Sequence, residues 1–244
     1  HGDVGMHAGS YMQGGEILIE GNADDFLGVE MKGGLIRVNG STGHRAGAAY
    51  RGSKYGMQGG IILVDGNVGH EVGAYMRRGL IVIKGNAEDF LGAMMATGTI
   101  CLFGQAGIRT GGGMQKGTIL CMHPVEMLPT FVYDCSYAPV FLQILFKGLK
   151  HLGVECPAGA NGLVRRYHGD LADVGKGAAF LLEAEQRRGI GVAQLLEGDP
   201  PVAVAIEDLV DHAEAPLTEA LLDFESFGDC DGRLAACPRQ AACV

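Results

Sequence analysis

The sequence predicts a mainly β protein, a single-stranded β-helix (solenoid) with coils of about 19 residues, capped by a C-terminal helix. A short phrase occurs six times, with a methionine followed by glycine three residues later and by isoleucine five residues later. The methionines are Met12, Met31, Met57, Met76, Met95 and Met114, at intervals of 19, 26, 19, 19 and 19 residues. A fixed period of about twenty residues is typical of a solenoid.

Each repeat contains an apolar pair that predicts one inward-facing strand. The isoleucine and the residue two positions later stay apolar, from Ile17 and Ile19 to Ile119 and Cys121. Residues spaced by two lie on the same face of a strand, so stacked coils form a continuous inner ladder. Burying one such side chain stabilises the fold by roughly 1.5–3 kcal/mol. A second alternating set before the methionine, 27, 29 and 31 in one repeat, predicts a second strand per coil.

Polar turns rich in glycine separate the two predicted strands. They include residues 21–28, 40–47, 66–73, 85–92 and 104–111. Gly, Asn and Asp tolerate positive φ, which predicts a corner at the same place in every coil. A phosphate-binding loop is a poor fit, because the spacing differs from GxxxxGKS and no such turn opens a helix.

The prolines divide the chain into three segments. None occurs before Pro124, as expected where strand amides bond to neighbouring strands. Residues 1–123 are predicted β-helix repeats, truncated at the N-terminus because His1 is not methionine and residues 2–12 match the second half of a repeat. Residues 124–177 predict a capping strand at 124–135, an amphipathic helix from Pro139 to about Leu152 and an irregular extended arm. Residues 178–244 form an acidic tail, partly helical or disordered, with four basic and thirteen acidic residues.

Composition argues against several classes of partner. No run of eighteen apolar residues suggests a membrane span. Residues 1–177 hold fifteen basic and fifteen acidic residues, so the repeats lack the basic excess that nucleic-acid binding needs. The seven cysteines contain no CxxC pair, which favours reduced thiols in a cytoplasmic protein.

No catalytic or metal-binding residue is predicted. His44 and His70 occupy one position in two repeats and are expected to lie near each other outside the coil. Asp25, Asp89 and Ile108 fill that position elsewhere, which a regular metal array would not permit. The carboxylate pairs at 24–25 and 88–89 lie on turns several coils apart, so nothing positions a substrate between them.

The break in the period is the candidate contact site. Seven residues are inserted at 51–57, and this loop carries Arg51, Lys54 and Tyr55. Insertions in a solenoid bulge outward and often make contacts, so we expect this loop to bind a partner or an anionic ligand. The alternative is a tolerated surface loop without a function. Further candidates of this kind are Arg77, Arg78, Arg165, Arg166, Tyr167 and Asp170.

These features together resemble a known family. They are the glycine turns, the methionine phrase, the insertion at 50–57, Leu-Pro-Thr-Phe at 128–131 and Arg-Tyr-His-Gly-Asp-Leu at 166–171. Residues 1–177 resemble the C-subunit family of formylmethanofuran dehydrogenase, and most narrowly the C subunit of the bacterial formyltransferase/hydrolase complex. The repeat alone is also similar to the GXGXG-type β-helix of the glutamate synthase large subunit.

The resemblance implies a non-catalytic scaffold subunit in one-carbon metabolism, in methanogenesis or methylotrophy. The implied partners are a metal-dependent hydrolase, a molybdopterin-type subunit and a formyltransferase. The implied complex transfers a formyl group and releases formate or, as an archaeal oxidoreductase, fixes carbon dioxide. Metal and a methanofuran- or methylofuran-type coenzyme are then expected on those partners, with no cofactor bound by this chain. No catalytic residue of the family maps onto it.

Two alternatives differ in class from this hypothesis. One is a structural domain of a glutamate-synthase-type amidotransferase, which would have glutaminase and flavin domains ahead of His1. The other is a free-standing β-helix lyase or carbohydrate binder. That function needs a groove of stacked aromatics or carboxylates, and a chain with 7% aromatic residues and no tryptophan offers little for it.

Overall fold

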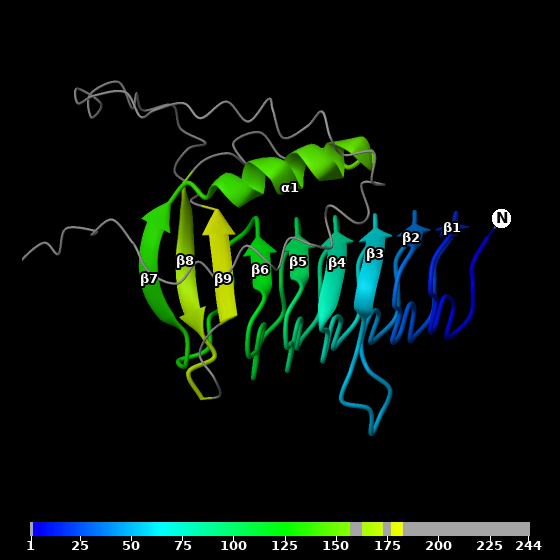
Figure 1. The fold of residues 1–244 in the computed structure, drawn as a ribbon, viewed down its shortest axis with the longest axis horizontal. Coiled ribbons are helices and arrows are strands. Elements are labelled where there is room, and N and C mark those ends of the chain that lie inside the picture. The colour runs from blue at the N-terminus through cyan, green and yellow to red at the C-terminus, as the bar shows by residue number, and fades with distance from the viewer. Residues whose placement is uncertain (1, 157–162, 173–176, 183–244) are drawn as a thin grey trace, which may run out of the picture.

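One sheet organises the protein. The computed structural model describes residues 2–156, 163–172 and 177–182 (Figure 1). In this part of the chain, nine strands form a sheet in the order β1-β2-β3-β4-β5-β6-β9-β8-β7, accompanied by one helix, α1. The protein is therefore mainly β, as predicted.

The repeats supply six parallel strands whose inward isoleucines are in register. They are β1 (Glu16–Ile19), β2 (Leu35–Val38), β3 (Gln58–Val64), β4 (Arg78–Ile83), β5 (Thr99–Leu102) and β6 (Thr118–Cys121). Isoleucine pairs with isoleucine throughout, as in Ile62 with Ile81 and Ile81 with Ile100. A slip of one residue would turn each isoleucine out of the inner column to the opposite face of the sheet.

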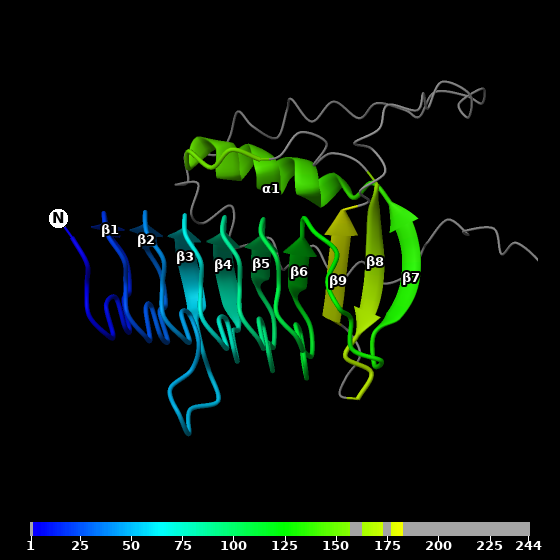
Figure 2. The same ribbon diagram turned by 180° about the vertical axis from the view of Figure 1, so that it is seen from behind.

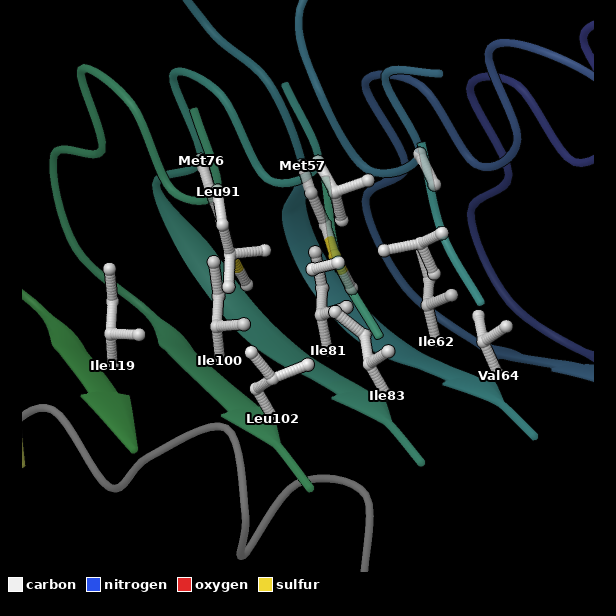
Figure 3. Close-up of a cluster of buried hydrophobic side chains, with 14 of the residues drawn as sticks. Met57, Ile62, Val64, Met76, Ile81, Ile83, Leu91, Ile100, Leu102 and Ile119 are labelled. Carbon is white, nitrogen blue, oxygen red and sulfur yellow. The ribbon is translucent and has the colours of Figure 1, made fainter. Parts of the chain in front are cut away.

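The predicted inner ladder is a column of side chains that solvent does not reach. Ile36, Ile62, Ile81, Ile100 and Ile119 are each 0% exposed. Figure 3 shows the last four of these isoleucines stacked beside Met57 and Met76. The repeated methionines therefore fill the interior together with the isoleucines.

The predicted second strand is wrong, although its inward residues are buried as expected. Leu27, Val29 and Met31 are at most 1% exposed. They lie in consecutive turns rather than a strand, because Phe26, Gly28 and Glu30 between them have positive φ. A second parallel ladder does exist, at single residues just before these turns: Val4, Ala23, Thr42, Val68, Ala87 and Ala106.

The corner prediction needs a correction as well. Glycine does supply positive φ, and at Gly47 an added Cβ would lie 2.7 Å from Cδ1 of Ile81, so a side chain there would displace the core column. The turn Asn and Asp residues of the described chain, however, are absent from the left-handed region. They serve instead as hydrogen-bond acceptors, described below.

Helix α1 (Val140–His151) covers the outer face of the sheet and does not cap its end. Its buried residues Leu142, Leu145, Phe146 and Leu149 pack against the outward side chains of β3 to β6. It runs across the strands from β9 towards β3 (Figures 1 and 2). The outer face explains this placement, because Leu63 and Val82 are apolar and buried there whereas Leu18 of β1 is 57% exposed.

The far end of the sheet consists of β7 (Val132–Tyr137), β8 (Val164–Gly169) and β9 (Gly177–Leu182). Strand β9 pairs in parallel with β6, and β8 then pairs antiparallel with both β9 and β7. The predicted irregular arm thus contains a regular strand. The sheet also extends five residues into the segment assigned to the tail, and residues 183–244 lie outside the described part of the chain.

The segment before β7 covers the end of the inner core. Phe131 is 8% exposed and belongs to that core, with Val125, Met127 and Leu128 packed against it. The capping strand expected at 124–135 begins only at Val132 and pairs with β8 at the edge of the sheet. With twelve residues, α1 is too short to cross a membrane, and the described residues form no other helix.

Candidate functional site

Two columns of side chains on the turns accept hydrogen bonds from the next repeat. In the first column, Asn22 Oδ1 accepts the Ser41 N–H at 2.9 Å and Ser41 Oγ accepts the Asn67 N–H at 3.0 Å. Asn67 and Asn86 continue the series with the amides of Asn86 and Gln105, both at 2.8 Å. Each side chain thus satisfies a backbone donor one repeat further on.

The second acceptor column contains the two equivalent histidines. Asp25 Oδ1 accepts the His44 N–H at 2.6 Å, and His44 Nδ1 accepts the His70 N–H at 2.9 Å. His70 Nδ1 accepts the Asp89 N–H at 3.2 Å, and Asp89 Oδ1 accepts the Ile108 N–H at 3.0 Å. Ile108 is the last member of the column, which explains why an apolar residue is tolerated there.

His44, His70 and Glu88 form a cluster whose donor atoms all lie within 4.8 Å of one another. The two rings stack 5.0 Å apart, and His70 Nε2 lies 3.0 Å from the Glu88 carboxylate. Because both Nδ1 atoms accept backbone N–H groups, each neutral ring carries its proton on Nε2. An ion at Nε2 would require that proton to move to Nδ1 and would break the column. We therefore assign the cluster to the hydrogen-bonded stack.

Two further columns, next to the acceptor columns, present large side chains at left-handed backbone positions. The first contains His7, Phe26, Arg45, Glu71, Phe90 and Arg109, with φ between 58° and 67°. The second contains Tyr11, Glu30, Tyr75 and Met94, with φ between 54° and 61°. None of these ten side chains is buried, and we call the two series the outward columns.

Backbone carbonyls accept the N–H groups of the outward columns up to Phe90 and Met94. Phe26 N–H donates to the His44 carbonyl at 2.9 Å, and Tyr75 N–H donates to the Ala93 carbonyl at 3.0 Å. The side chains at these positions are therefore available for other contacts.

An aromatic cluster occupies the N-terminal end of the outward columns. His7 stacks on Phe26 at 5.0 Å, and the Tyr50 ring lies 5.9 Å from Phe26 and 5.6 Å from Tyr11. The Tyr50 hydroxyl lies 2.9 Å from Nδ1 of His7. Partial desolvation and then the Glu30 carboxylate raise the pKa of Tyr11.

The inserted loop lies beside this cluster. Arg51 and Lys54 are exposed, and Tyr55 is 43% exposed with the Arg77 guanidinium 3.8 Å above its ring centroid. The structure therefore brings together two predicted contact residues, Tyr55 and Arg77. Arg78 is exposed at the start of β4. The loop and α1 project to opposite sides of the molecule (Figures 1 and 2).

The remaining predicted contact residues lie apart from the loop, in or just after β8. Arg166 Nε lies 3.5 Å from Asp134 Oδ2, and the Tyr167 ring contacts Tyr133 edge-on at 5.8 Å. Arg165 is exposed on the same strand. These residues belong to the far end of the sheet and form a second, separate location.

Asp170 is 5% exposed and bonds within the chain. Its carboxylate accepts the N–H groups of Gly113 at 3.0 Å and Ala172 at 2.9 Å. Burial alone raises the pKa of this carboxyl, but the Thr130 hydroxyl beside it and the two amides outweigh that effect and lower it. We therefore leave Asp170 out of the contact surface.

Sequence reasoning missed the outward columns. Tyr11, Phe26, Arg45 and Phe90 are not among the predicted contact residues, although Phe26, Arg45 and Phe90 lie at equivalent places in their repeats. A signal was available, because the position before the inward Leu27, Ala46 or Leu91 holds a large residue in each repeat.

Comparisons with known proteins place the chain in a family. A model of the GXGXG motif family matches residues 1–134, and the chain belongs to that family. It is similar to a chain in the crystal structure of the formyltransferase/hydrolase complex (FhcABCD) from Methylorubrum extorquens in complex with methylofuran. The TM-score is 0.69 and the identity 37%, over 74% of this chain and 68% of that chain.

A curated relative makes the assignment narrower. The C subunit of the formyltransferase/hydrolase complex Fhc of Methylorubrum extorquens is 46% identical over 55 residues, which cover 22% of this chain and 21% of the relative. The aligned stretch thus spans about a fifth of the length of that protein. Together with the structural match, it makes this chain a protein of the C-subunit type.

Proposed function

We propose that this chain is a non-catalytic scaffold subunit of a formyltransferase/hydrolase-type complex in one-carbon metabolism. The observation that carries the proposal is the 37% identity to a chain of the FhcABCD complex over 74% of this chain. Both named relatives belong to that complex, which favours it over an amidotransferase domain.

The interior supports a structural role. Two parallel ladders, the sheet and the row of single bridges, stack repeat on repeat, and we infer from them a single-stranded β-helix over residues 2–123. Its core is filled by isoleucine and methionine at 0% exposure. Such a core has no space for a substrate.

Several reactive groups among the described residues have structural uses. His44 and His70 accept backbone hydrogen bonds, and Asp170 fixes the end of the stack. Burial raises the pKa of Cys121 to about 12 and also raises the pKa of Cys101. A thiol that stays protonated is a poor nucleophile and metal ligand.

We infer that the chemistry belongs to partner subunits. The expected partners are a metal-dependent hydrolase, a molybdopterin-type subunit and a formyltransferase, working in the cytoplasm. The M. extorquens complex was crystallised with methylofuran, which supports a coenzyme of that type on the assembly.

Affinity purification from the source cells tests the proposal. We expect the tagged full chain to co-purify with subunits identified by mass spectrometry as formyltransferase- and hydrolase-like. We expect the isolated chain to leave formylated coenzyme unchanged, while the purified assembly turns it over. Turnover by the isolated monomer would contradict the non-catalytic role, and co-purification with a glutaminase would favour the amidotransferase alternative.

A further inference from the structure

We propose that the outward columns and the inserted loop form the surface through which this chain binds a partner subunit that presents carboxylates. We call it the aromatic–arginine face and define it by Tyr11, Phe26, Arg45, Tyr50, Tyr55 and Arg77. This inference rests on the proposed function and adds to it the location and chemistry of the contact.

The backbone gives the first argument. Left-handed φ is unfavourable for residues other than glycine by roughly 1–2 kcal/mol, and Asn and Asp tolerate it best. Phe26, Arg45 and Tyr75 nevertheless occupy this region, at φ 63°, 63° and 61°. Glycine or asparagine would serve the turn better, so the turn geometry does not explain these residue types. Strained positions with large side chains are typical of functional surfaces.

The composition of the face gives the second argument. Tyrosine and arginine are the residue types most enriched among those that dominate binding energy at protein interfaces. Four of the seven tyrosines of the chain lie in this region: Tyr11 and Tyr75 in the outward columns, Tyr55 in the loop and Tyr50 in the aromatic cluster beside it. Tyr11 and Tyr55 are 52% and 43% exposed, so a partner would still bury considerable aromatic surface.

The face is also preorganised. Tyr50 is held by ring contacts to Phe26 and Tyr11 and by its hydroxyl, which donates to Ser10 Oγ at 3.1 Å. The inserted loop is anchored where it returns, because Gly56 N–H donates to the Tyr75 carbonyl at 2.8 Å. Side chains fixed before binding lose less entropy on association, which favours affinity.

Charge identifies the chemistry of the partner. Glu71 and Arg45 pair at 3.0 Å and neutralise each other, so Arg45 adds no net charge. Glu30 is the remaining acid of the outward columns, and it accepts the Tyr50 N–H at 3.3 Å. The loop adds the exposed cations Arg51 and Lys54, and Arg77 stacks on Tyr55. A guanidinium stacked on a ring can still form a two-pronged bond to a carboxylate, so we infer an acidic protein surface as the partner.

A rival surface exists at the far edge of the sheet. Val132 and Tyr133 of β7 are 51% and 52% exposed. Their backbone lies outside the left-handed region, and Tyr133 is bonded to Ser136 through its hydroxyl at 3.1 Å. Tyr133 matches the exposure of Tyr11, which makes it an internal control.

Hydroxyl-radical footprinting of the full chain, alone and in the complex purified from source cells, tests the location. We expect the oxidation of Tyr11 and Tyr55 to slow by about tenfold on assembly, because a buried hot-spot residue loses its contact with water. The oxidation of Tyr133 should not change. Protection of Tyr133 without protection of Tyr11 and Tyr55 would overturn the proposal in favour of the β7 edge.

Substitutions test the energetic role. Tyr55→Ala and Arg77→Ala should each weaken retention of the identified subunits by about tenfold or more while the melting temperature stays unchanged. Tyr133→Ala, the matched control, should retain them. Full retention by the first two variants would overturn this inference and leave the proposed function intact. A wild-type chain that co-purifies with no formyltransferase- or hydrolase-like subunit would overturn both.

Discussion

The acceptor columns and the outward columns lie side by side on the same turns but differ in what determines their residues. In the acceptor columns, each side chain bonds the backbone of the next repeat, so the positions hold Asn, Ser, Asp or His until the last repeat. In the outward columns, backbone carbonyls satisfy the amides, and the side chains range from phenylalanine to glutamate. The first set is fixed by the fold, and the second is free to serve contacts outside it.

We expect the largest loss of stability from a substitution in the interior. Ile81→Asp places an unpaired charge at a site with 0% exposure, so we expect the free energy of unfolding to fall by more than about 4 kcal/mol. Urea denaturation measures it. Leu18→Asp on the outer face of β1, where the side chain is 57% exposed, is the control and should have little effect. Wild-type stability of the Ile81 variant would contradict the register.

We expect the next largest loss of stability at Asp170, because its carboxylate accepts the last N–H of an outward column. Its carboxylate takes the Gly113 N–H, whereas the preceding amides, such as that of Met94, donate to carbonyls of the next repeat. Asp170→Asn should lower the free energy of unfolding at pH 7 by about 1–3 kcal/mol, since the charged acceptor is lost.

The same variant tests the pH dependence. The pKa of Asp170 is lowered in the folded protein, so its stabilisation is present above the ordinary value of about 4 and is lost as the pH falls through the lower folded value. Urea denaturation at pH 7 and pH 3 should therefore show a smaller difference between wild type and Asp170→Asn at the lower pH. An equal difference at both would refute the assignment.

The acceptor columns should show a moderate effect that depends on position. Asn67→Ala removes the acceptor for the Asn86 N–H and should cost about 0.5–1.5 kcal/mol of unfolding free energy. Gln105→Ala is the matched control, because Gln105 ends the same column and has no following repeat to bond. Equal losses in thermal denaturation would show that the side-chain acceptors do not stabilise the stack.

The outward columns should show the smallest effect, and in the opposite direction. Tyr75→Asn replaces a residue at φ 61° with one that tolerates the left-handed region, so we expect stability to stay constant or to rise by up to about 1 kcal/mol. Tyr133→Asn, outside that region, should show no gain. A clear loss of stability at position 75 would indicate that the outward side chains are structural.

Sequence patterns that depend on one physical cause were predictable. The isoleucine column follows from alternation alone, and Ile17 to Ile119 pair as expected. The second strand was mispredicted because turns with alternating left-handed residues also bury every second side chain, at Leu27, Val29 and Met31. Alternation does not distinguish these two backbones.

Patterns that require a comparison between repeats were harder to interpret. The outer face changes from exposed Leu18 to buried Leu63 and Val82, and this change shows where α1 packs. It is visible only when the strands are compared with one another. The inserted loop was found from the broken period, whereas its pairing with Arg77 depends on tertiary structure. Residues of the outward columns share a backbone position but differ in side-chain chemistry. A search for hydrophobic patterns therefore did not find them.

The in-register stack has a consequence for assembly geometry. Neighbouring parallel strands lie about 4.8 Å apart, and equivalent residues sit directly above one another. Distance along the stack therefore increases in steps of one repeat. Gaining or losing one whole repeat would move the inserted loop and β7 apart or together by one step while leaving each intact. Two proteins bound at these places would be held at a distance set by the number of repeats between them.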